Sequence, residues 1–381
     1  MMRGLEFFAA LLTVSVGFGQ QESAFFRIVS PANSEITGLQ ADGTLAWANA
    51  ETAGVTCMVQ RATTLTGPSN WVDYVQHAAT NASVALRVFD PAPPLGMALI
   101  PAGSFQMGDS INGYNKYEKP THTVYVSAFY LGKTEVTWAE WQVVRDWSTA
   151  NGYGYDNVGS GKADNHPVHT VNWHDAVKWC NARSQKEGRP VCYYTDAALT
   201  QVYKAGQVAP YVKWTAAGYR LPTEAEWEKA ARGGLSNKRF PWGDMITHSK
   251  ANYYSTGDAA YFYDISPTQG YHPVYGKDPY PYTNPVGTFD ANGYGLHDMA
   301  GNIVEWCWDR YDGYYYATSP SRNPHGPETG SFRVLRGGSW FQQDATYSRV
   351  VSRSTSYNPT YNGGVNNKYL GFRVVLSTGQ Q

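Results

Sequence analysis

The sequence predicts an α+β protein with few regular elements, preceded by a small all-β domain. Three observations carry this prediction. Residues 25–90 alternate short apolar runs with turns, and two later stretches carry helix-capping signatures. Beyond residue 240 almost nothing is periodic, although the chain there is rich in Gly, Tyr, Asn and Pro. With 381 residues, the chain has room for two domains.

The N-terminal segment predicts a signal peptide over residues 1–19. MMRGLEFFAALLTVSVGFGQQ places Arg3 before an apolar run and ends that run at a small-x-small pattern, Gly17-Phe18-Gly19. Glu6 is atypical of such a leader. No later segment reaches the roughly 18 apolar residues that a membrane span needs. We therefore expect an exported protein without a membrane span, either secreted, periplasmic or at the cell surface.

The first domain is expected over residues 25–90. GVTCMVQRA, NWVDYVQHA and SVALRVFD have the length and spacing of strands in a small β-sandwich-like domain. A Pro-rich linker follows at residues 91–95, where PAPP stiffens the chain. Residues 96–377 then form the second domain.

The second domain opens with strands and continues with three helices. GMALIPAGSFQMGD and THTVYVSAFYLGKTEV each predict two strands. Thr137 and Glu140 form a capping box, a second helix is expected over residues 173–184, and Thr223 with Glu226 opens a third. Gly233 is the expected C-cap of that third helix. The aperiodic tract that follows is too aromatic for disorder, so bound metal is a candidate for what holds it.

Charge and composition limit the classes of molecule that the protein is expected to bind. The net charge is -1 and the Lys and Arg residues are scattered, which argues against a nucleic-acid partner. The 29 Tyr and 13 Trp suit either a recognition surface or the interior of a loop-rich core.

Cys180 and Cys192 bracket one short loop, and an oxidising compartment would allow a disulfide between them. Such a bond contributes about 3 kcal/mol in the chain-entropy model. The alternative is two separate buried thiols. Cys57 and Cys307 have no evident partner, and no CxxC or Cys/His metal spacing occurs.

A calcium loop is one interpretation of the stretch from Asp298 to Glu305. Two carboxylates flank a glycine, and carbonyls of Gly301 and Ile303 would add oxygens to the shell that calcium prefers. A capped acidic turn without metal is the alternative. The histidines of HPVHTVNWHD match no metal-ligand spacing and are interpreted as structural.

Ordered motifs then give a resemblance. GMALIPAGSFQMGD, FYLGKTEVTWAEW, GYRLPTEAEWEKAARGG, NPVGTFDANGYGLHDMAGNIVEWCWD and RVLRGGSW with GFRV resemble the formylglycine-generating enzyme family, also called sulfatase-modifying-factor domains. The resemblance implies a C-type-lectin-like fold with two calcium sites. One site would use Asp298, Gly301, Ile303 and Glu305. The other would use Asn252 and Asp278 with the carbonyls of Tyr253 and Tyr280.

The resemblance also implies a copper oxidase, and here the sequence departs from the family. The family holds copper between two cysteines after the GGS motif, and soft thiolates suit Cu(I). The first position falls on Gln342 and the second on Ala345 or Tyr347, and no cysteine follows Cys307. We therefore do not expect copper, and whether the protein is an enzyme stays open.

What remains after the glycine pair is a polar segment suited to holding a ligand. Its candidate binding residues are Ser339, Trp340, Gln342, Tyr347, Arg349 and Arg353. Structural ion pairs are the alternative for the two arginines. Three functions are compatible: a secreted module that binds a peptide or glycan, an oxidase or another oxidative protein-modifying enzyme of the family, and a retroelement-diversified lectin-fold receptor.

Overall fold

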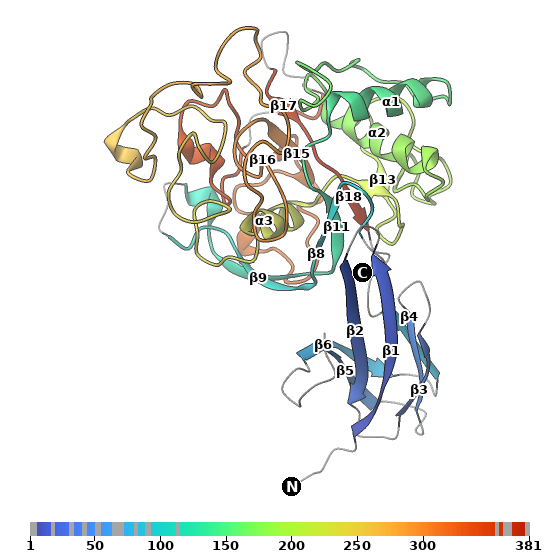
Figure 1. Cartoon of the computed structure of the whole chain (residues 1–381). Coiled ribbons are helices and arrows are strands. Elements are labelled where there is room, and N and C mark those ends of the chain that lie inside the picture. The colour runs from blue at the N-terminus through green and yellow to red at the C-terminus, as the bar shows by residue number, and fades with distance from the viewer. Residues whose placement is uncertain are drawn as a thin grey trace. The chain divides into compact units, whose positions relative to one another are not determined.

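The structure is a computed structural model of the chain, shown in Figure 1. It describes residues 6–16, 20–29, 34–39, 44–49, 55–62, 72–79, 83–87, 93–111, 115–354, 358–360 and 368–377. The chain divides into two compact units, residues 1–94 and 95–381. The mixed α+β class with few helices and several small sheets is confirmed.

The first unit consists of two antiparallel sheets (Figure 1). One has the strand order β1-β2-β5-β6 and the other the order β3-β4-β7. Buried side chains come from both sheets, including Ile28 and Val59 in the first and Trp47 in the second. The bounds are β1 (Glu6–Val16), β2 (Gln20–Val29), β3 (Ser34–Leu39), β4 (Thr44–Asn49), β5 (Val55–Ala62), β6 (Val72–Ala79) and β7 (Ser83–Arg87).

Strand β1 lies within the expected signal peptide. It pairs antiparallel with β2, from Glu6 opposite Val29 to Val16 opposite Gln20. Cleavage near Gly19 would remove β1 and leave β2 as an edge strand of its sheet. The signal peptide stays a prediction.

The second unit has short strands in four sheets. Its largest sheet has the order β14-β18-β11-β8, and a three-stranded sheet has the order β16-β15-β17. β9 pairs with β10, and β12 pairs with β13. The bounds are β8 (Met97–Ile100), β9 (Gly103–Met107), β10 (His122–Val126), β11 (Phe129–Gly132), β12 (Tyr193–Tyr194), β13 (Tyr211–Val212), β14 (Tyr219–Arg220), β15 (Val304–Arg310), β16 (Arg333–Arg336), β17 (Leu370–Gly371) and β18 (Val375–Ser377).

The three expected helices are present, and two of them begin at the predicted capping residues. α1 (Trp138–Thr149) and α3 (Glu224–Arg232) have the expected capping boxes, and Gly233 is left-handed at φ 55°. α2 (Trp173–Lys186) has a box that was not foreseen, formed by Asn172 and Asp175. α1 and α2 lie side by side (Figure 1). Among the described residues, no helix is long and apolar enough to cross a membrane.

The aperiodic tract between α3 and β15 is ordered by its own contacts. A small apolar cluster includes Phe240, Tyr253 and Tyr263. The side-chain amide of Asn292 donates to the carbonyls of Ala230 and Ala231 at 2.8 and 3.2 Å. These bonds satisfy carbonyls that the end of α3 leaves open, so the tract and the helix stabilise each other.

α3 is fully buried, and its three glutamates are each paired with arginines from elsewhere in the chain. Glu226 pairs with Arg220 at 2.5 and 2.6 Å. Burial alone would raise the pKa of the Glu226 carboxyl, but the charge of Arg220 outweighs it and lowers that pKa. Removing one member of such a pair leaves the other buried and uncompensated, which is strongly destabilising.

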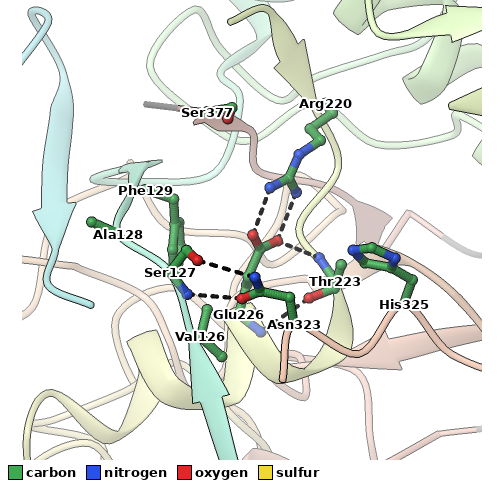
Figure 2. A pocket seen from close by; sticks show the side chains of 10 residues that line it. All are labelled: Val126, Ser127, Ala128, Phe129, Arg220, Thr223, Glu226, Asn323, His325 and Ser377. Carbon is green, nitrogen blue, oxygen red and sulfur yellow. Dashed lines mark hydrogen bonds and ion pairs between the residues drawn. The ribbon is translucent and has the colours of Figure 1, made fainter. Parts of the chain in front are cut away.

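This pair lines a small cavity of about 10 Å³. Figure 2 shows the side chains that line it. Asn323 joins the cavity wall by accepting from the backbone N–H of Ser127 at 2.8 Å and bonding the Ser127 hydroxyl at 3.0 Å (Figure 2). His325 also lines it and stacks on Trp214, with ring centroids 3.6 Å apart. The space suits about one water molecule, not a ligand.

Arg336 is the most connected of these arginines. It contacts Glu228 at 2.6 Å and Glu224 at 3.2 Å, and donates to the carbonyls of Val350 and Ser352 at 2.9 and 3.0 Å. It therefore joins α3, β16 and the segment that follows the glycine pair.

We expect Arg336→Met to lower the free energy of unfolding by about 3–5 kcal/mol. The substitution removes a buried cation and leaves Glu224 and Glu228 with one arginine each instead of two. The control is Arg145→Met, whose partner Asp146 is largely exposed, with an expected loss within about 1 kcal/mol. Urea midpoints of the two variants measure the difference. Equal shifts in both would contradict the role given to Arg336.

Candidate functional site

The glycine pair after β16 determines the direction of the chain that follows, which holds the candidate ligand-binding residues Ser339 to Arg353. Gly337 and Gly338 are left-handed at φ 97° and 70°. A Cβ on Gly338 would lie 2.7 Å from the Ser348 hydroxyl oxygen, so both conformation and space require glycine there.

Beyond the pair, Ser339 and Trp340 are buried. The Trp340 indole N–H donates to the carbonyl of Lys368 at 3.3 Å, and its ring lies 5.2 and 5.3 Å from the rings of Tyr280 and Tyr282. Trp340 is therefore a packed residue and offers no open face to a ligand.

Gln342 and Tyr347 do line an open cleft, with a volume of about 240 Å³. The Gln342 side-chain carbonyl oxygen is buried and has no hydrogen-bond donor among the described residues. Tyr347 is 39% exposed. Phe341 and Tyr369 also line the cleft, stacked with ring centroids 4.8 Å apart. The remaining lining residues are Val304, Leu335, Gln343, Asp344 and Ser354.

The two arginines predicted as ligand contacts are in buried ion pairs. Arg349 makes a two-pronged pair with Glu118 at 2.9 and 3.0 Å. Arg353 makes another with Glu224 at 2.6 and 2.8 Å. Neither lines the Gln342 cleft. The physical reason is that Glu118 and Glu224 are buried carboxylates and require cationic partners.

All four cysteines are buried, and Cys180, Cys192 and Cys307 are free thiols. The structure therefore does not form the expected bond between Cys180, on α2, and Cys192. The Cys192 thiol points to the carbonyl of Ala216 instead, 3.9 Å away. Burial raises the pKa of the Cys192 thiol to about 11 and that of Cys307 well above its ordinary value. None of the four lines the cleft, so its donor set does not fit a copper ion held by two thiolates.

The three histidines of the HPVHTVNWHD segment are buried, and each bonds a hydroxyl. His166 contacts Thr283, His169 contacts Thr170, and His174 contacts Tyr203, at 2.8, 2.8 and 3.1 Å. Burial lowers the pKa of His166 and His174 to about 4 and that of His169 to about 3.

The first predicted calcium segment forms a tight left-handed loop. Asp298 has φ 55° and Gly301 has φ 86°, where a Cβ would lie 2.4 Å from the carbonyl oxygen of Asn252. The Asp298 carboxylate accepts from the backbone N–H of Gly287 at 2.7 Å. Glu305 at the other end is already paired with Arg373, with both distances at 2.7 Å.

Glu135 lies beside this segment, and sequence reasoning missed it. It is fully buried after β11, and one carboxylate oxygen accepts from the Asn302 amide at 3.0 Å. Its other oxygen and the side-chain oxygen of buried Asn284 have no donor among the described residues. A single glutamate between Thr134 and Val136 carries no motif that would mark it.

The Glu135 carboxyl lies near two other carboxyls, those of Asp298 and Glu305, and one guanidinium, that of Arg373. Burial and the nearby charge of Asp298 raise the pKa of the Glu135 carboxyl well above its ordinary value, while Arg373 opposes the shift. Within the described residues, no three His, Cys, Asp or Glu side chains converge closely enough to hold an ion alone. Carbonyl and carboxamide oxygens would have to complete the shell, as they commonly do for calcium. The unpartnered oxygens of Glu135 and Asn284 fit that requirement.

The second predicted calcium set is only partly brought together. The Asn252 amide donates to the carbonyl of Tyr282 at 2.7 Å, which joins its segment to the one that holds Tyr280. The carbonyl of Tyr253 bonds the His248 ring at 3.1 Å. Asp278 and Tyr280 are exposed. This site therefore has weaker structural support than the first.

Comparisons with known proteins bear on the second unit. The family described as "Sulfatase-modifying factor enzyme 1-like domain" matches residues 88–378. A formylglycine-generating enzyme of Streptomyces coelicolor is 35% identical over 302 residues, covering 75% of this chain and 90% of that protein. The "Chaperone protein LppX" of Paenibacillus barcinonensis is 31% identical over 294 residues, covering 74% and 89%.

A solved structure agrees. "Treponema denticola variable protein 1" superposes with a TM-score of 0.56 at 31% identity, covering 74% of this chain and 94% of that one. The ordered motifs, the fold and these likenesses agree, and the chain belongs to the sulfatase-modifying factor family, with the domain of the formylglycine-generating enzymes.

Proposed function

We propose that this protein is an exported, calcium-stabilised member of its family that binds a peptide or glycan in the Gln342 cleft and carries out no copper oxidation. One observation carries the proposal. At the position that the resemblance assigns to a copper-binding cysteine, the chain has a carboxamide whose buried oxygen lacks a donor. A ligand N–H or O–H would satisfy it.

The chemistry of the cleft suits a polar ligand that is not an anion, because the Asp344 carboxylate is among the lining residues. Gln342 and Gln343 offer amide donors and acceptors, and Phe341 and Tyr347 offer partly exposed rings. Peptide groups and sugar hydroxyls both pair with carboxamides, and aromatic faces pack against apolar parts of either ligand. Among the described side chains that line the cleft, none is an evident nucleophile activated by a neighbouring base.

Calcium would stabilise the loop beneath the cleft. Glu135, Asn284, Asp298 and the carbonyls of Gly301 and Ile303 would hold it, supplying oxygens to a hard cation. The predicted calcium loop and the cleft are connected directly. The backbone N–H of Trp340 donates to the carbonyl of Asn302 at 3.0 Å, and Val304 lines the cleft. Export is supported by the composition of residues 1–19.

Two alternatives have specific support. The 35% identity to a formylglycine-generating enzyme favours an oxidase or another oxidative protein-modifying enzyme of the family. The likeness to a Treponema protein named as variable favours a retroelement-diversified receptor. A near-copy of the gene's 3′ end beside a reverse transcriptase would distinguish the receptor.

Calcium is expected to raise the melting temperature of the full chain, since a ligand at 100 times its Kd adds about 2.7 kcal/mol to stability. The stability of Glu135→Gln relative to the wild type should depend on whether calcium is present. It removes a buried like charge, so in chelator the variant should equal or exceed the wild type in stability. In calcium it should be less stable, because a ligand is lost.

Thermal melts with EDTA and with calcium test this expectation, and exposed Glu328→Gln is the matched control. Identical wild-type melts in both conditions would contradict the calcium site. The control should track the wild type throughout.

Binding in the cleft is expected to require Tyr347 and Gln342. Arrays of synthetic peptides and of glycans, probed with the calcium-loaded chain, should identify ligands whose binding falls at least about tenfold with Gln342→Ala or Tyr347→Ala, as for the loss of one good contact. Exposed Tyr314→Ala is the control and should bind normally. Binding to neither array, or equal loss in the control, would contradict the proposal.

A further inference from the structure

A second cavity lies apart from the Gln342 cleft and is lined by cationic side chains. Its volume is about 280 Å³, enough for a small polar group. Its lining shares no residue with that of the cleft. The residues that matter here are Asp109, Arg232, Lys238, Arg239, Phe262 and Arg349.

Two of these cations are already neutralised. Arg232 contacts the carboxylate of Glu228 at 2.7 Å and the carbonyl of Gly108 at 3.0 Å. Arg349 is held by Glu118 through two bonds. Both are buried, so they form a fixed, charge-balanced wall.

The other two cations share one carboxylate. The Lys238 ammonium contacts Asp244 at 2.7 Å, whereas the nearest Arg239 guanidinium nitrogen lies 3.9 Å from the other oxygen of Asp244. That distance is too long for a hydrogen bond. Two positive charges therefore face one negative charge at this side of the cavity.

The position of Arg239 is fixed by aromatic rings instead. Its guanidinium carbon lies 5.1 Å from the ring centre of Phe262 and 5.3 Å from that of Tyr263. The side chain is only 19% exposed. Arg239 therefore lines the cavity with a preoriented fork of N–H donors, and the nearest carboxylate oxygen, on Asp244, lies 3.9 Å away.

Such a fork matches the geometry of an oxyanion. A guanidinium donates two parallel hydrogen bonds to a carboxylate or to a phosphoryl or sulfuryl group, and Lys238 would add a point charge. One lining carboxylate, Asp109, opposes an anion, but it accepts from the backbone N–H of Ile111 at 2.8 Å. The cationic side chains that line the cavity outnumber it.

We propose that this cavity, which we call the Arg239 pocket, binds an oxyanion group through Arg239 and Lys238. The group is a carboxylate or a sulfate or phosphate ester carried by a ligand. The inference does not depend on ligand binding in the Gln342 cleft, and the two can fail separately.

Equilibrium dialysis of radiolabelled sulfate against the full chain, with calcium and at constant ionic strength, tests the proposal. The wild type should bind one sulfate per chain in a saturable way. Arg239→Met should weaken binding at least about tenfold, because it removes charge-assisted hydrogen bonds. Arg239→Lys should bind at an intermediate level, because it keeps the charge but loses the fork.

The matched control is Arg322→Met, which removes another stacked arginine, 4.2 Å from the ring centre of Tyr125 and outside the pocket lining. It should bind like the wild type. Should Arg239→Met fail to fold by circular dichroism, Lys238→Met replaces it, since that side chain is 43% exposed. Competition by acetate or by methyl phosphate tells which oxyanion is preferred, and either supports the proposal. No saturable sulfate binding, or equal binding by Arg239→Met and Arg322→Met, would overturn it.

Discussion

The second unit depends on the buried charge pairing around α3. Each of its glutamates contacts an arginine from a different part of the chain: Glu224 with Arg353, Glu226 with Arg220, and Glu228 with Arg336. The unit has short strands and long loops, so few backbone ladders connect its parts. Arginine–carboxylate pairs take over that role. The pairs of Glu224 with Arg353 and of Glu226 with Arg220 are two-pronged, so each fixes both the distance and the orientation of two segments. Their energetic value lies in the cost of breaking them, since a buried charge without its partner is expensive.

The buried charge pairing explains which functional groups remain available to bind a ligand. Arg349 and Arg353 sit in the segment that follows the glycine pair, yet buried glutamates take both. The cleft is left with carboxamides, the Asp344 carboxylate, hydroxyls and aromatic rings, and all four cysteines are buried outside its lining. The segment therefore keeps the family's backbone and presents a different set of functional groups. A neutral polar ligand suits such a surface better than a redox metal does.

The confirmed predictions depend either on neighbouring residues or on the order of motifs along the chain. The capping boxes at Thr137 and Thr223 and the left-handed Gly233 depend on neighbouring residues, and all three are confirmed. The family motifs predicted the fold because they occur in the same order along this chain as in the family. The roles of Arg349, Glu135 and Arg239 depend on partners remote in sequence, such as Glu118 for Arg349, and no local pattern marks them. The expected Cys180 bond was inferred from loop length alone, which does not determine where the thiols point.

The central claim is that the Gln342 cleft has replaced copper chemistry with ligand binding. The most direct test is a titration of Cu(I) against a competing chelator, with calcium present, while oxygen consumption is followed on a cysteine-containing sulfatase peptide. We predict neither tight one-to-one copper binding nor turnover, because the cleft offers no thiolate. Tight binding with turnover would contradict the claim, and it would mean that Cys307 or other donors have assumed the role of the missing pair.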